Sequence, residues 1–270
     1  MIIKMKIIVK STYKLFKNVG IDFYILLQSI RGIPNFINDW IKFSRNNKLK
    51  QDFAIKSLMP ILADRYDGAG VAKGHYFHQD LLVAQKIFKT NPISHVDVGS
   101  RIDGFVAHIA SFRKIEILDF RPLSTNINNI KFLQLDLTLK ENPYSNYCDS
   151  LSCLHAIEHF GLGRYGDPID SEGHLKGFDN LYNILKPNGT LYFSTPIGKQ
   201  KIVFNAHRIF SIEYLLKMFE NKFVVISFSY VDDSGNLHQA INHLSALAMN
   251  NFNLEYGCGI FELKKIDPIQ

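Results

Sequence analysis

The stretch His95-Val-Asp-Val-Gly-Ser-Arg-Ile-Asp-Gly104 decides the fold. A short apolar run leads into a glycine turn, and residues 105–112 then have the pattern of a helix. Gly99 lets backbone approach a ligand closely, and a turn before a helix can point N–H groups at that ligand. The glycine spacing, G-x-x-x-x-G at 99 and 104, differs from the dinucleotide pattern G-x-G-x-x-G. The stretch therefore indicates a strand, a ligand-binding turn and a helix.

Outward from this stretch, short apolar runs alternate with helical or loop segments. The runs are residues 94–99, 115–119, 131–136, 150–155, 190–195, 223–230 and 258–265. Strands that alternate with crossovers predict a mostly parallel sheet with helices on both faces. We therefore expect an α/β fold with a doubly wound, Rossmann-like, seven-stranded sheet.

Three successive predicted strands carry an aspartate at or near their carboxyl ends, namely Asp97, Asp119 and Asp136. In open α/β sheets ligands bind outside the carboxyl ends of the strands. Asp119 lies 20 residues after Gly99, where a carboxylate can accept both hydroxyls of an adenosine ribose. A single aspartate of this kind would be read as a helix cap. Three in succession favour a binding site.

Composition limits the class of protein. At 270 residues the chain is long enough for one sizeable α/β domain and an appendage. The three cysteines are an odd number without a framework spacing, which fits a reducing, cytoplasmic compartment. No apolar run reaches the ~18–20 residues that span a bilayer, and the start lacks a small-residue cleavage site.

The net charge of +6 is concentrated at the beginning of the chain. Residues 1–50 contain ten Lys or Arg and two acids, a net of +8, so the other 220 residues carry a net −2. A domain that reads nucleic acid is expected to carry its own positive charge, so no nucleic-acid partner is predicted. We expect a basic helical extension over residues 1–55 and the α/β domain over 56–270. The extension either lies peripherally on the inner membrane face or on a partner, or has a solvated basic face.

Several segments resemble class I S-adenosylmethionine-dependent methyltransferases. They are D-V-G-S-R at 97–101, the strand ends at Asp119 and Asp136, and S-L-S-C-L-H-A-I-E-H at 150–159. More narrowly, H-Y-F-H-Q-D, H-A-I-E-H-F-G-L-G-R-Y-G-D-P, F-N-A-H-R-I-F and Y-G-C-G-I-F-E-L resemble a bacterial and nematode domain-of-unknown-function family related to methyltransferases. The resemblance covers roughly residues 60–265, and some members of that family lie near polysaccharide genes.

The resemblance implies a site for S-adenosylmethionine. Asp97 and Gly99 would line its methionine part, Asp119 would hold the ribose, and Asp136 with Leu137 would face the adenine. Ser100 and Gly104 belong to the same glycine loop. Arg101 stands where the motif usually has a glycine. An arginine there can clamp the cofactor carboxylate in a bidentate pair, or it can fill the pocket.

The segment His155-Ala-Ile-Glu-His159 carries the candidate catalytic groups. A hydroxyl acceptor must lose a proton, and His155, Glu158 or His159 can take it. The segment is also formally H-x-x-E-H, the inverted zinc-peptidase motif, which requires both histidines on one helix face. Here it straddles a strand end, so we expect no metal. His159 alone can equally be a hydrogen-bonding residue of the loop.

Candidate substrate-binding residues lie in three other segments. Gly161–Pro168 is glycine-rich and suits a lid that brings Arg164 and Tyr165 over a polar substrate, with a plain structural turn as the alternative. His75 and His78 precede a predicted helix that begins at Asp80, and they suit closing the cofactor pocket from the N-terminal side. Zinc binding by these two and another histidine is an alternative that we do not favour. Asn205, His207 and Arg208 follow the fifth strand and suit contacts to a sugar or an anionic group.

These residues predict a methyltransferase that uses S-adenosylmethionine and methylates an oxygen of a small molecule or carbohydrate. The resemblance indicates an acceptor in surface polysaccharide biosynthesis. The alternative is a non-catalytic binding or scaffold protein on the same fold, because one α/β frame supports many functions.

Overall fold

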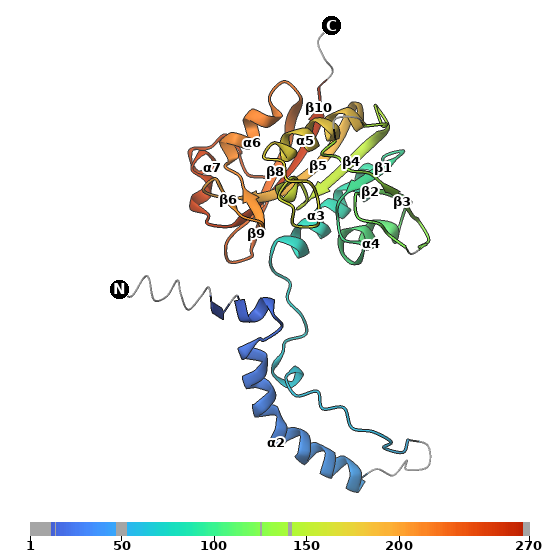
Figure 1. Cartoon of the computed structure of the whole chain (residues 1–270), viewed down its shortest axis with the longest axis vertical. Helices are drawn as coiled ribbons and strands as arrows, with labels where there is room; N and C mark the ends of the chain where they lie inside the picture. Colours follow the sequence, from blue (N-terminus) through green and yellow to red (C-terminus); the bar gives the residue numbers. More distant parts are fainter. Residues whose placement is uncertain (1–11, 14, 47–52, 125, 140–141, 267–270) are drawn as a thin grey trace, which may run out of the picture. The chain divides into compact units, whose positions relative to one another are not determined.

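A computed structural model describes residues 12, 13, 15–46, 53–124, 126–139 and 142–266 (Figure 1). Lys6, Lys10 and Lys14, which contribute to the expected basic helix, lie outside the described residues. The chain separates into two compact units, residues 1–71 and 72–270. The domain boundary expected between residues 55 and 56 falls inside the first unit and stays a prediction.

The first unit is built around α2, Phe23–Asn46. The η1 turn, Asp64–Tyr66, packs on this helix: the Tyr66 hydroxyl accepts a hydrogen bond from the Asn35 amide at 3.1 Å, and its ring lies 5.1 Å from the Arg31 guanidinium. Arg65 forms an ion pair with Asp39. Within the described residues, no helix is both long enough and apolar enough to cross a membrane.

The second unit holds the sheet. Its strands are β1 His95–Val98, β2 Ile115–Asp119, β3 Ile130–Gln134, β4 Cys148–Leu154, β5 Leu185–Ile197, β6 Lys201–Val203, β7 His207–Ile209, β8 Phe223–Val231, β9 Leu237–His238 and β10 Gly257–Lys265. Its helices and turns are α3 His75–Thr90, η2 Ile102–Val106, α4 Ala107–Ala110, η3 Ile157–His159, α5 Gly173–Ile184, α6 Ile212–Phe219, α7 Ala246–Met249 and η4 Asn251–Asn253.

The central sheet has the order β3-β2-β1-β4-β5-β10-β8-β9. The first five strands in this order pair in parallel, whereas β10 is antiparallel to both β5 and β8. All seven predicted strands are present, which confirms a mostly parallel α/β fold. The expected number of strands was wrong, because the two-residue strand β9 adds an eighth. The separate β6–β7 hairpin was also missed, since three-residue strands leave little pattern to detect.

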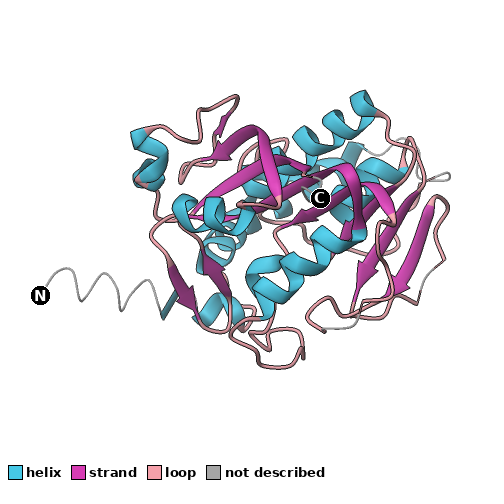
Figure 2. Ribbon diagram, turned by 90° about the horizontal axis from the view of Figure 1, so that it is seen from above, coloured by secondary structure: helices cyan, strands magenta, loops and turns pink. Residues whose placement is uncertain are grey.

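Helices cover both faces of the sheet (Figure 2). On one face α3, η2 and α4 pack on Ile115 and Ile117 of β2 and Ile260 of β10. On the other face α5 and α6 pack on Leu118, Phe193 and Phe261. Adjacent residues of one strand thus enter different cores, as the alternation of side chains along a strand requires. The doubly wound architecture is therefore confirmed.

The parallel pairing brings three loops to one edge. β1, β2 and β4 are neighbours, and each ends in the same direction. Gly99 follows β1, Asp119 ends β2 and His155 follows β4. This is the edge at which open α/β sheets bind ligands.

Candidate functional site

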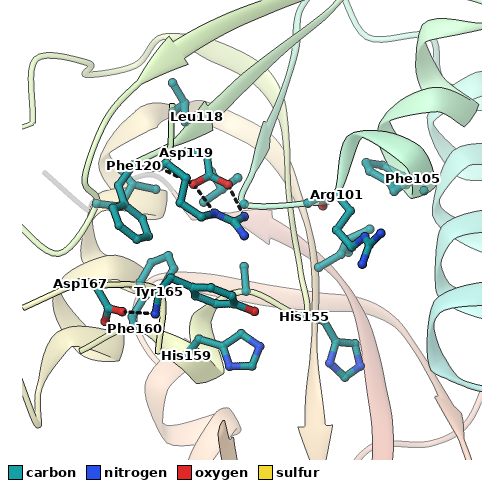
Figure 3. A pocket seen from close by; sticks show the side chains of 18 of the residues that line it. Arg101, Phe105, Leu118, Asp119, Phe120, His155, His159, Phe160, Tyr165 and Asp167 are labelled. Carbon is teal, nitrogen blue, oxygen red and sulfur yellow. Dashed lines mark hydrogen bonds and ion pairs between the residues drawn. The ribbon is translucent and has the colours of Figure 1, made fainter. Parts of the chain in front are cut away.

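A cavity of about 380 Å³ opens at this edge. Its wall combines apolar side chains with charged groups from the loops after β1, β2, β3 and β4. The lining residues are Tyr76, Gln79, Asp80, Val98–Arg101, Asp103–Phe105, Leu118–Arg121, Leu135–Thr138, Leu154–Ala156, His159, Phe160, Tyr165 and Asp167. Figure 3 shows Asp119 and Phe120 on one side and His155 and His159 on another. The size and mixture of groups suit a small organic ligand.

The glycine turn after β1 is held from behind by Asp97. The Asp97 side chain is fully buried, and it accepts hydrogen bonds from the Ser100 backbone N–H at 3.0 Å and from the Ser100 and Ser152 hydroxyls. Burial raises the pKa of Asp97 to about 7, although the three donors oppose the rise. The sequence predicted that Asp97 would line the cavity, but it does not. Asp97 instead fixes the turn that lines the cavity.

Gly99 is required by its conformation and its surroundings. Its φ is +72°, and a Cβ there would meet the Cβ of Ala156 at 3.0 Å. Its N–H donates to the Leu118 carbonyl at 3.0 Å, which ties the turn to β2. Gly104 at the far end of the loop also lines the cavity, and a Cβ there would lie 3.2 Å from an Asp80 carboxylate oxygen. The loop therefore brings backbone to the cavity surface.

Arg101 does not fill the cavity. Its side chain is 75% exposed, and its guanidinium makes two hydrogen bonds, of 2.9 and 2.6 Å, to the Asp103 carboxylate. Both residues contribute to the cavity wall. The structure therefore excludes the role in which Arg101 fills the pocket. A contact between Arg101 and a ligand carboxylate stays a prediction.

Asp119 lies in the cavity wall at the end of β2, and its carboxylate is already engaged (Figure 3). Oδ1 accepts hydrogen bonds from the Arg121 backbone N–H and Nε at 2.9 and 3.0 Å, and Oδ2 accepts one from Arg121 Nη2 at 2.5 Å. A carboxylate offers about four acceptor sites, so it can accept further donors. Arg121 was not singled out from the sequence, although an arginine two residues after a strand-ending acid is a usable signal.

Asp136 and Leu137 line the cavity after β3. Asp136 Oδ1 accepts hydrogen bonds from the Thr138 backbone N–H and hydroxyl at 2.8 and 2.7 Å, which close a local turn. This turn presents the half-buried Asp136 and the buried Leu137 to the same space. An acid beside apolar side chains suits the edge and face of a base such as adenine.

His155 and Glu158 form a buried pair after β4. His155 Nδ1 lies 2.7 Å from Glu158 Oε1, and the two side chains are 2% and 1% exposed. Burial alone lowers the pKa of His155, but the neighbouring Cys258 and Glu158 raise it well above its usual value. Burial likewise raises the pKa of Glu158, but the neighbouring His155 and, to a smaller extent, His159 lower it, so the net direction is downward. We infer an imidazolium–carboxylate pair.

His159 has the opposite character. Its Nδ1 lies 2.7 Å from the Ala206 carbonyl oxygen, which places the proton on Nδ1 and leaves Nε2 as an acceptor. Burial lowers the pKa of His159, and the attraction of Glu158 only partly opposes this. His155 has a φ of +50° and precedes the η3 turn, so the two histidines do not share a helix face as the inverted zinc-peptidase motif requires.

The glycine-rich loop 161–168 is organised by Asp167. Its carboxylate accepts hydrogen bonds from the backbone N–H groups of Gly161, Gly163 and Tyr165 at 3.0 to 3.2 Å. The Tyr165 ring lines the cavity and lies 4.7 Å from the Arg121 guanidinium. The loop therefore connects the cavity to the end of β2, and its opening and closing stay a prediction.

The other expected substrate-binding residues do not line the cavity. Arg164 Nη1 donates to the Ala206 carbonyl at 3.0 Å, and Arg208 is 4% exposed, with its guanidinium on the carbonyls of Phe160 and Ser171. Backbone carbonyls in loops lack the partners that helices and sheets provide, so these two arginines stabilise the loops by donating hydrogen bonds to them. His75, His78, Asn205 and His207 are likewise outside the residues that line the cavity. Tyr165 alone of this group reaches it.

Comparison with known proteins gives one family and a set of distant structures. Residues 106–253 match the model of the family described as "Caenorhabditis protein of unknown function, DUF268". No curated protein matches the chain.

Among solved structures, the chain is similar to the [4+2]-cyclase SpnF, with 14% identity, 80% of this chain and 86% of that chain covered, and a TM-score of 0.49. It is also similar to the N-methyltransferase NodS from Bradyrhizobium japonicum with S-adenosylhomocysteine, with 10% identity, 79% and 95% covered, and a TM-score of 0.48. A Burkholderia thailandensis 1,6-didemethyltoxoflavin-N1-methyltransferase shares 10% identity over 87% of this chain and 89% of that one, with a TM-score of 0.48.

The strand order, the antiparallel β10 between β5 and β8, and the cavity at the ends of β1 and β2 define an α/β protein of the class I methyltransferase-like fold. Within this class, the chain belongs to the DUF268 family, since the family model covers more than half of it.

Proposed function

We propose that this protein is an S-adenosylmethionine-dependent methyltransferase that acts on a hydroxyl oxygen. The observation that carries the proposal is the cavity at the carboxyl ends of β1 and β2, with the Gly99 turn on one side and the Asp119 carboxylate in its wall. The residues present fit the cofactor: a Cβ-free turn admits the methionine part, Asp119 suits ribose hydroxyls, and Leu137 and Asp136 suit adenine.

The bound cofactor would supply a methyl group that its sulfonium already activates. The work left to the chain is to position the acceptor and to take up its proton. We assign the proton to His159 Nε2, because Nδ1 is committed to the Ala206 carbonyl and burial keeps the ring neutral. His155 is less suited to this step, since its raised pKa keeps the ring protonated. Glu158 holds His155 in place.

The acceptor we propose is a sugar hydroxyl of a surface polysaccharide or its precursor, made in the cytoplasm. This part rests on the resemblance to family members near polysaccharide genes. Tyr165 and Phe160 offer aromatic surface in the cavity wall, which is a common partner for the apolar faces of a small acceptor.

The first experiment measures cofactor binding by titration calorimetry of the full chain with S-adenosylmethionine. We expect micromolar binding, and about 10- to 100-fold weaker binding for Asp119→Ala, since a hydrogen bond to a charged group contributes ~1.5–3 kcal/mol. Glu213→Ala is the matched control, because Glu213 is an exposed acid of α6 paired only with Lys217 in the described structure. Folded protein that binds no cofactor would remove the methyltransferase proposal and favour the scaffold alternative.

We also propose a peripheral contact of residues 1–50 with an anionic membrane surface. Along α2 the side chains Phe23, Leu26, Ile30, Ile33, Ile37 and Trp40 recur every three or four residues, and each is more than 40% exposed in its unit. The net charge of +8 in residues 1–50 supplies the electrostatic attraction. Sedimentation with phosphatidylglycerol vesicles tests the proposal: Ile30→Glu with Ile37→Glu should abolish binding, and Asn38→Glu should not. Equal binding to vesicles of zwitterionic phosphatidylcholine, which has no net charge, would contradict it.

A further inference from the structure

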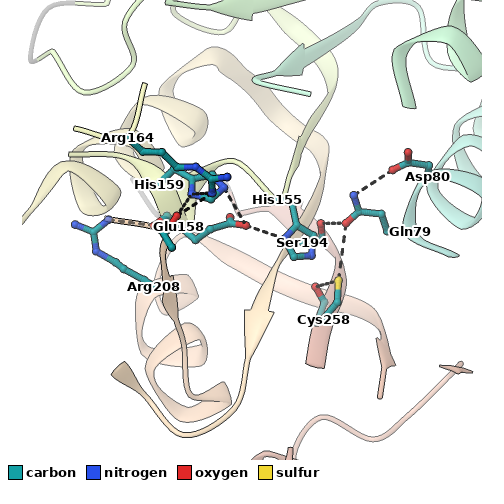
Figure 4. Close-up of polar contacts among 11 residues, drawn as sticks. Gln79, Asp80, His155, Glu158, His159, Arg164, Ser194, Arg208 and Cys258 are labelled. Atoms are coloured by element: carbon teal, nitrogen blue, oxygen red, sulfur yellow. Dashed lines mark hydrogen bonds and ion pairs between the residues drawn. The ribbon is translucent and has the colours of Figure 1, made fainter. Parts of the chain in front are cut away.

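Three metal-ligating side chains meet beside the cavity. His75 begins α3, His155 follows β4, and Cys258 is the second residue of β10. One ligand atom from each lies within 4.8 Å of the other two. The rings of His75 and His155 stack with their centroids 5.1 Å apart. Figure 4 shows Cys258 beside His155, with Glu158 on the other side of the imidazole.

The cluster holds an unsatisfied buried nitrogen. His155 Nε2 is buried and has no oxygen or nitrogen hydrogen-bond partner among the described residues, and besides Glu158 the Cys258 thiol interacts with this imidazole. Buried polar atoms in native structures nearly always have a partner, so a lone one needs an explanation. Because Nδ1 is held by Glu158, Nε2 is the nitrogen that faces another group, and a metal ion that binds there displaces the proton that Nε2 carries in the imidazolium.

The surroundings orient both imidazoles as ligand histidines are oriented. A histidine that binds metal commonly gives its other ring nitrogen to a carboxylate or a backbone carbonyl. Glu158 does this for His155, and the backbone of Tyr256 makes a hydrogen bond to the His75 ring that favours its protonated form. The Cys258 thiol lies 3.8 Å from Gln79 Oε1, which is a weak contact for a thiol to give up.

A nucleophilic role for the cysteine does not fit the same geometry. Cys258 is fully buried and is not among the residues that line the cavity, so its sulfur cannot reach a substrate there. His155 does line the cavity. An ion held by the three side chains would therefore sit directly behind the cavity wall, with His155 between cavity and sulfur.

We propose that His75 Nε2 or Nδ1, His155 Nε2 and the Cys258 thiolate bind one divalent transition-metal ion of the zinc type. Two imidazoles and a thiolate are a zinc donor set, with bonds of about 2.0–2.1 Å to nitrogen and 2.3 Å to sulfur. Tetrahedral bonds of that length place ligand atoms roughly 3.3–3.6 Å apart, so the cluster has to contract by about 1 Å. Three ligands leave a fourth position for water or a substrate atom.

This site differs from the H-x-x-E-H arrangement, which would use His155 and His159 with Glu158 as a base. Here Glu158 supports His155 from behind, and His159 takes no part. The cysteine and the first histidine lie 183 residues apart in the chain, so no local motif announces the site. It also goes beyond the methyltransferase proposal, since it requires neither cofactor nor acceptor.

The test is a cobalt titration of the full, chelator-treated chain in the absence of S-adenosylmethionine. Tetrahedral Co²⁺ with a thiolate ligand gives visible d–d bands and a near-ultraviolet sulfur-to-cobalt charge-transfer band. We expect both to saturate at one ion per chain, and Zn²⁺ to abolish them by displacement. Because ligand binding releases protons, the apparent affinity should rise with pH.

Variants identify the ligands. Cys258→Ser should lose the charge-transfer band, and His75→Ala should weaken cobalt binding at least tenfold. Glu158→Gln should weaken it about 10- to 100-fold, as loss of a carboxylate behind a ligand histidine does. Cys148→Ser, also a buried strand cysteine, and His78→Ala, in the same helix as His75, are the matched controls and should bind normally.

Two results would overturn the proposal: wild-type protein without a saturable charge-transfer band, or the same band in Cys258→Ser. Circular dichroism establishes that each variant is folded. If Cys258→Ser fails to fold, His75→Ala still decides, because His75 is only half-buried at the start of α3. Calorimetry with S-adenosylmethionine is independent of these spectra, so the cofactor proposal and the metal proposal can fail separately.

Discussion

The loops after β1 and β4 enter the same cavity, yet their buried acids are used differently. Asp97 is satisfied by two serine hydroxyls and a backbone N–H, whereas Glu158 is paired with a histidine whose second nitrogen has no oxygen or nitrogen partner in the described structure. When every buried polar atom of a network has a hydrogen-bond partner, the network holds the backbone in one conformation. When one atom lacks such a partner, that atom stays available to a ligand or a proton. The first loop therefore supports the site, and the second carries its chemistry.

The largest effect we expect concerns the pH dependence of stability at the first loop. The pKa of Asp97 is raised to about 7 by burial, so the folded state binds more protons than the unfolded state between about pH 4 and 7. Its contribution lowers the free energy of unfolding as pH rises through that window, by about 3–5 kcal/mol. Burial lowers the pKa of neighbouring His95 to about 3, so between pH 3 and 6.5 His95 has the opposite effect.

These two opposing slopes can be separated by substitution. Asp97→Asn should leave a free energy of unfolding that rises with pH up to about 6.5, and His95→Gln should leave one that falls up to about 7. Urea unfolding at a series of pH values measures both, and the differences from wild type remove the other titrating groups. Parallel curves for the two variants would show that the buried network is not the one described.

The next effect separates support from chemistry. His159→Ala should lower kcat about 100-fold, the lower end of what a general base contributes, with the Kd for S-adenosylmethionine unchanged. His238→Ala, which removes a half-buried histidine paired with Asp232 outside the cavity, is the control. If kcat is unaffected in His159→Ala, another group takes the proton. The loop after β4 would then not differ from the loop after β1 by carrying the catalytic base.

A smaller effect is expected at the glycine turn. Gly99 has a positive φ, and the Cβ introduced by Gly99→Ala meets Ala156. Gly166 also has a positive φ, +87°, but the Cβ introduced by Gly166→Ala has no atom within 4 Å. Both variants carry the ~1–2 kcal/mol cost of a left-handed residue, and only Gly99→Ala adds a steric clash. We expect Gly99→Ala to lower the free energy of unfolding by about 1 kcal/mol more. Thermal denaturation of both variants tests this, and equal losses would mean that the turn is not crowded.

The smallest effect concerns Arg121, which competes for the Asp119 carboxylate. Arg121→Ala removes the two guanidinium hydrogen bonds to the carboxylate and keeps the backbone N–H bond to Oδ1, so it should strengthen S-adenosylmethionine binding a few-fold, opposite in sign to Asp119→Ala. Calorimetry under the same conditions measures it. Weaker binding in Arg121→Ala would instead assign the arginine a direct contact with the ligand.

The fold was predictable because its signals are local. Each of the seven expected strands is a short segment rich in apolar residues, and it is bounded by helical or loop segments, which is the pattern that predicts a strand. Two of the three strand-end acids, Asp119 and Asp136, also located the cavity, since the ends of parallel strands gather at one edge. The two-residue strand β9 and the β6–β7 hairpin escaped because so few residues carry no periodicity.

The roles of individual side chains were less predictable, because they depend on residues far along the chain. Asp97 accepts a hydrogen bond from Ser152, 55 positions away, and Arg208 donates to the carbonyls of Phe160 and Ser171. The meeting of His75 with Cys258 needs α3 and β10 in place together. Strand pattern places a residue at an edge, but only the packed structure decides whether it faces the cavity or the core.

The position of β10 has a consequence for how the protein is made. This strand, Gly257–Lys265, is the last of the sheet in sequence, yet it lies between β5 and β8 and joins them. On the ribosome, β1 to β5 can pair as they emerge, but β8 has only β9 beside it until residues 257–265 leave the exit tunnel. A nascent chain that stops before residue 257 thus exposes two unpaired strand edges, which are templates for aggregation.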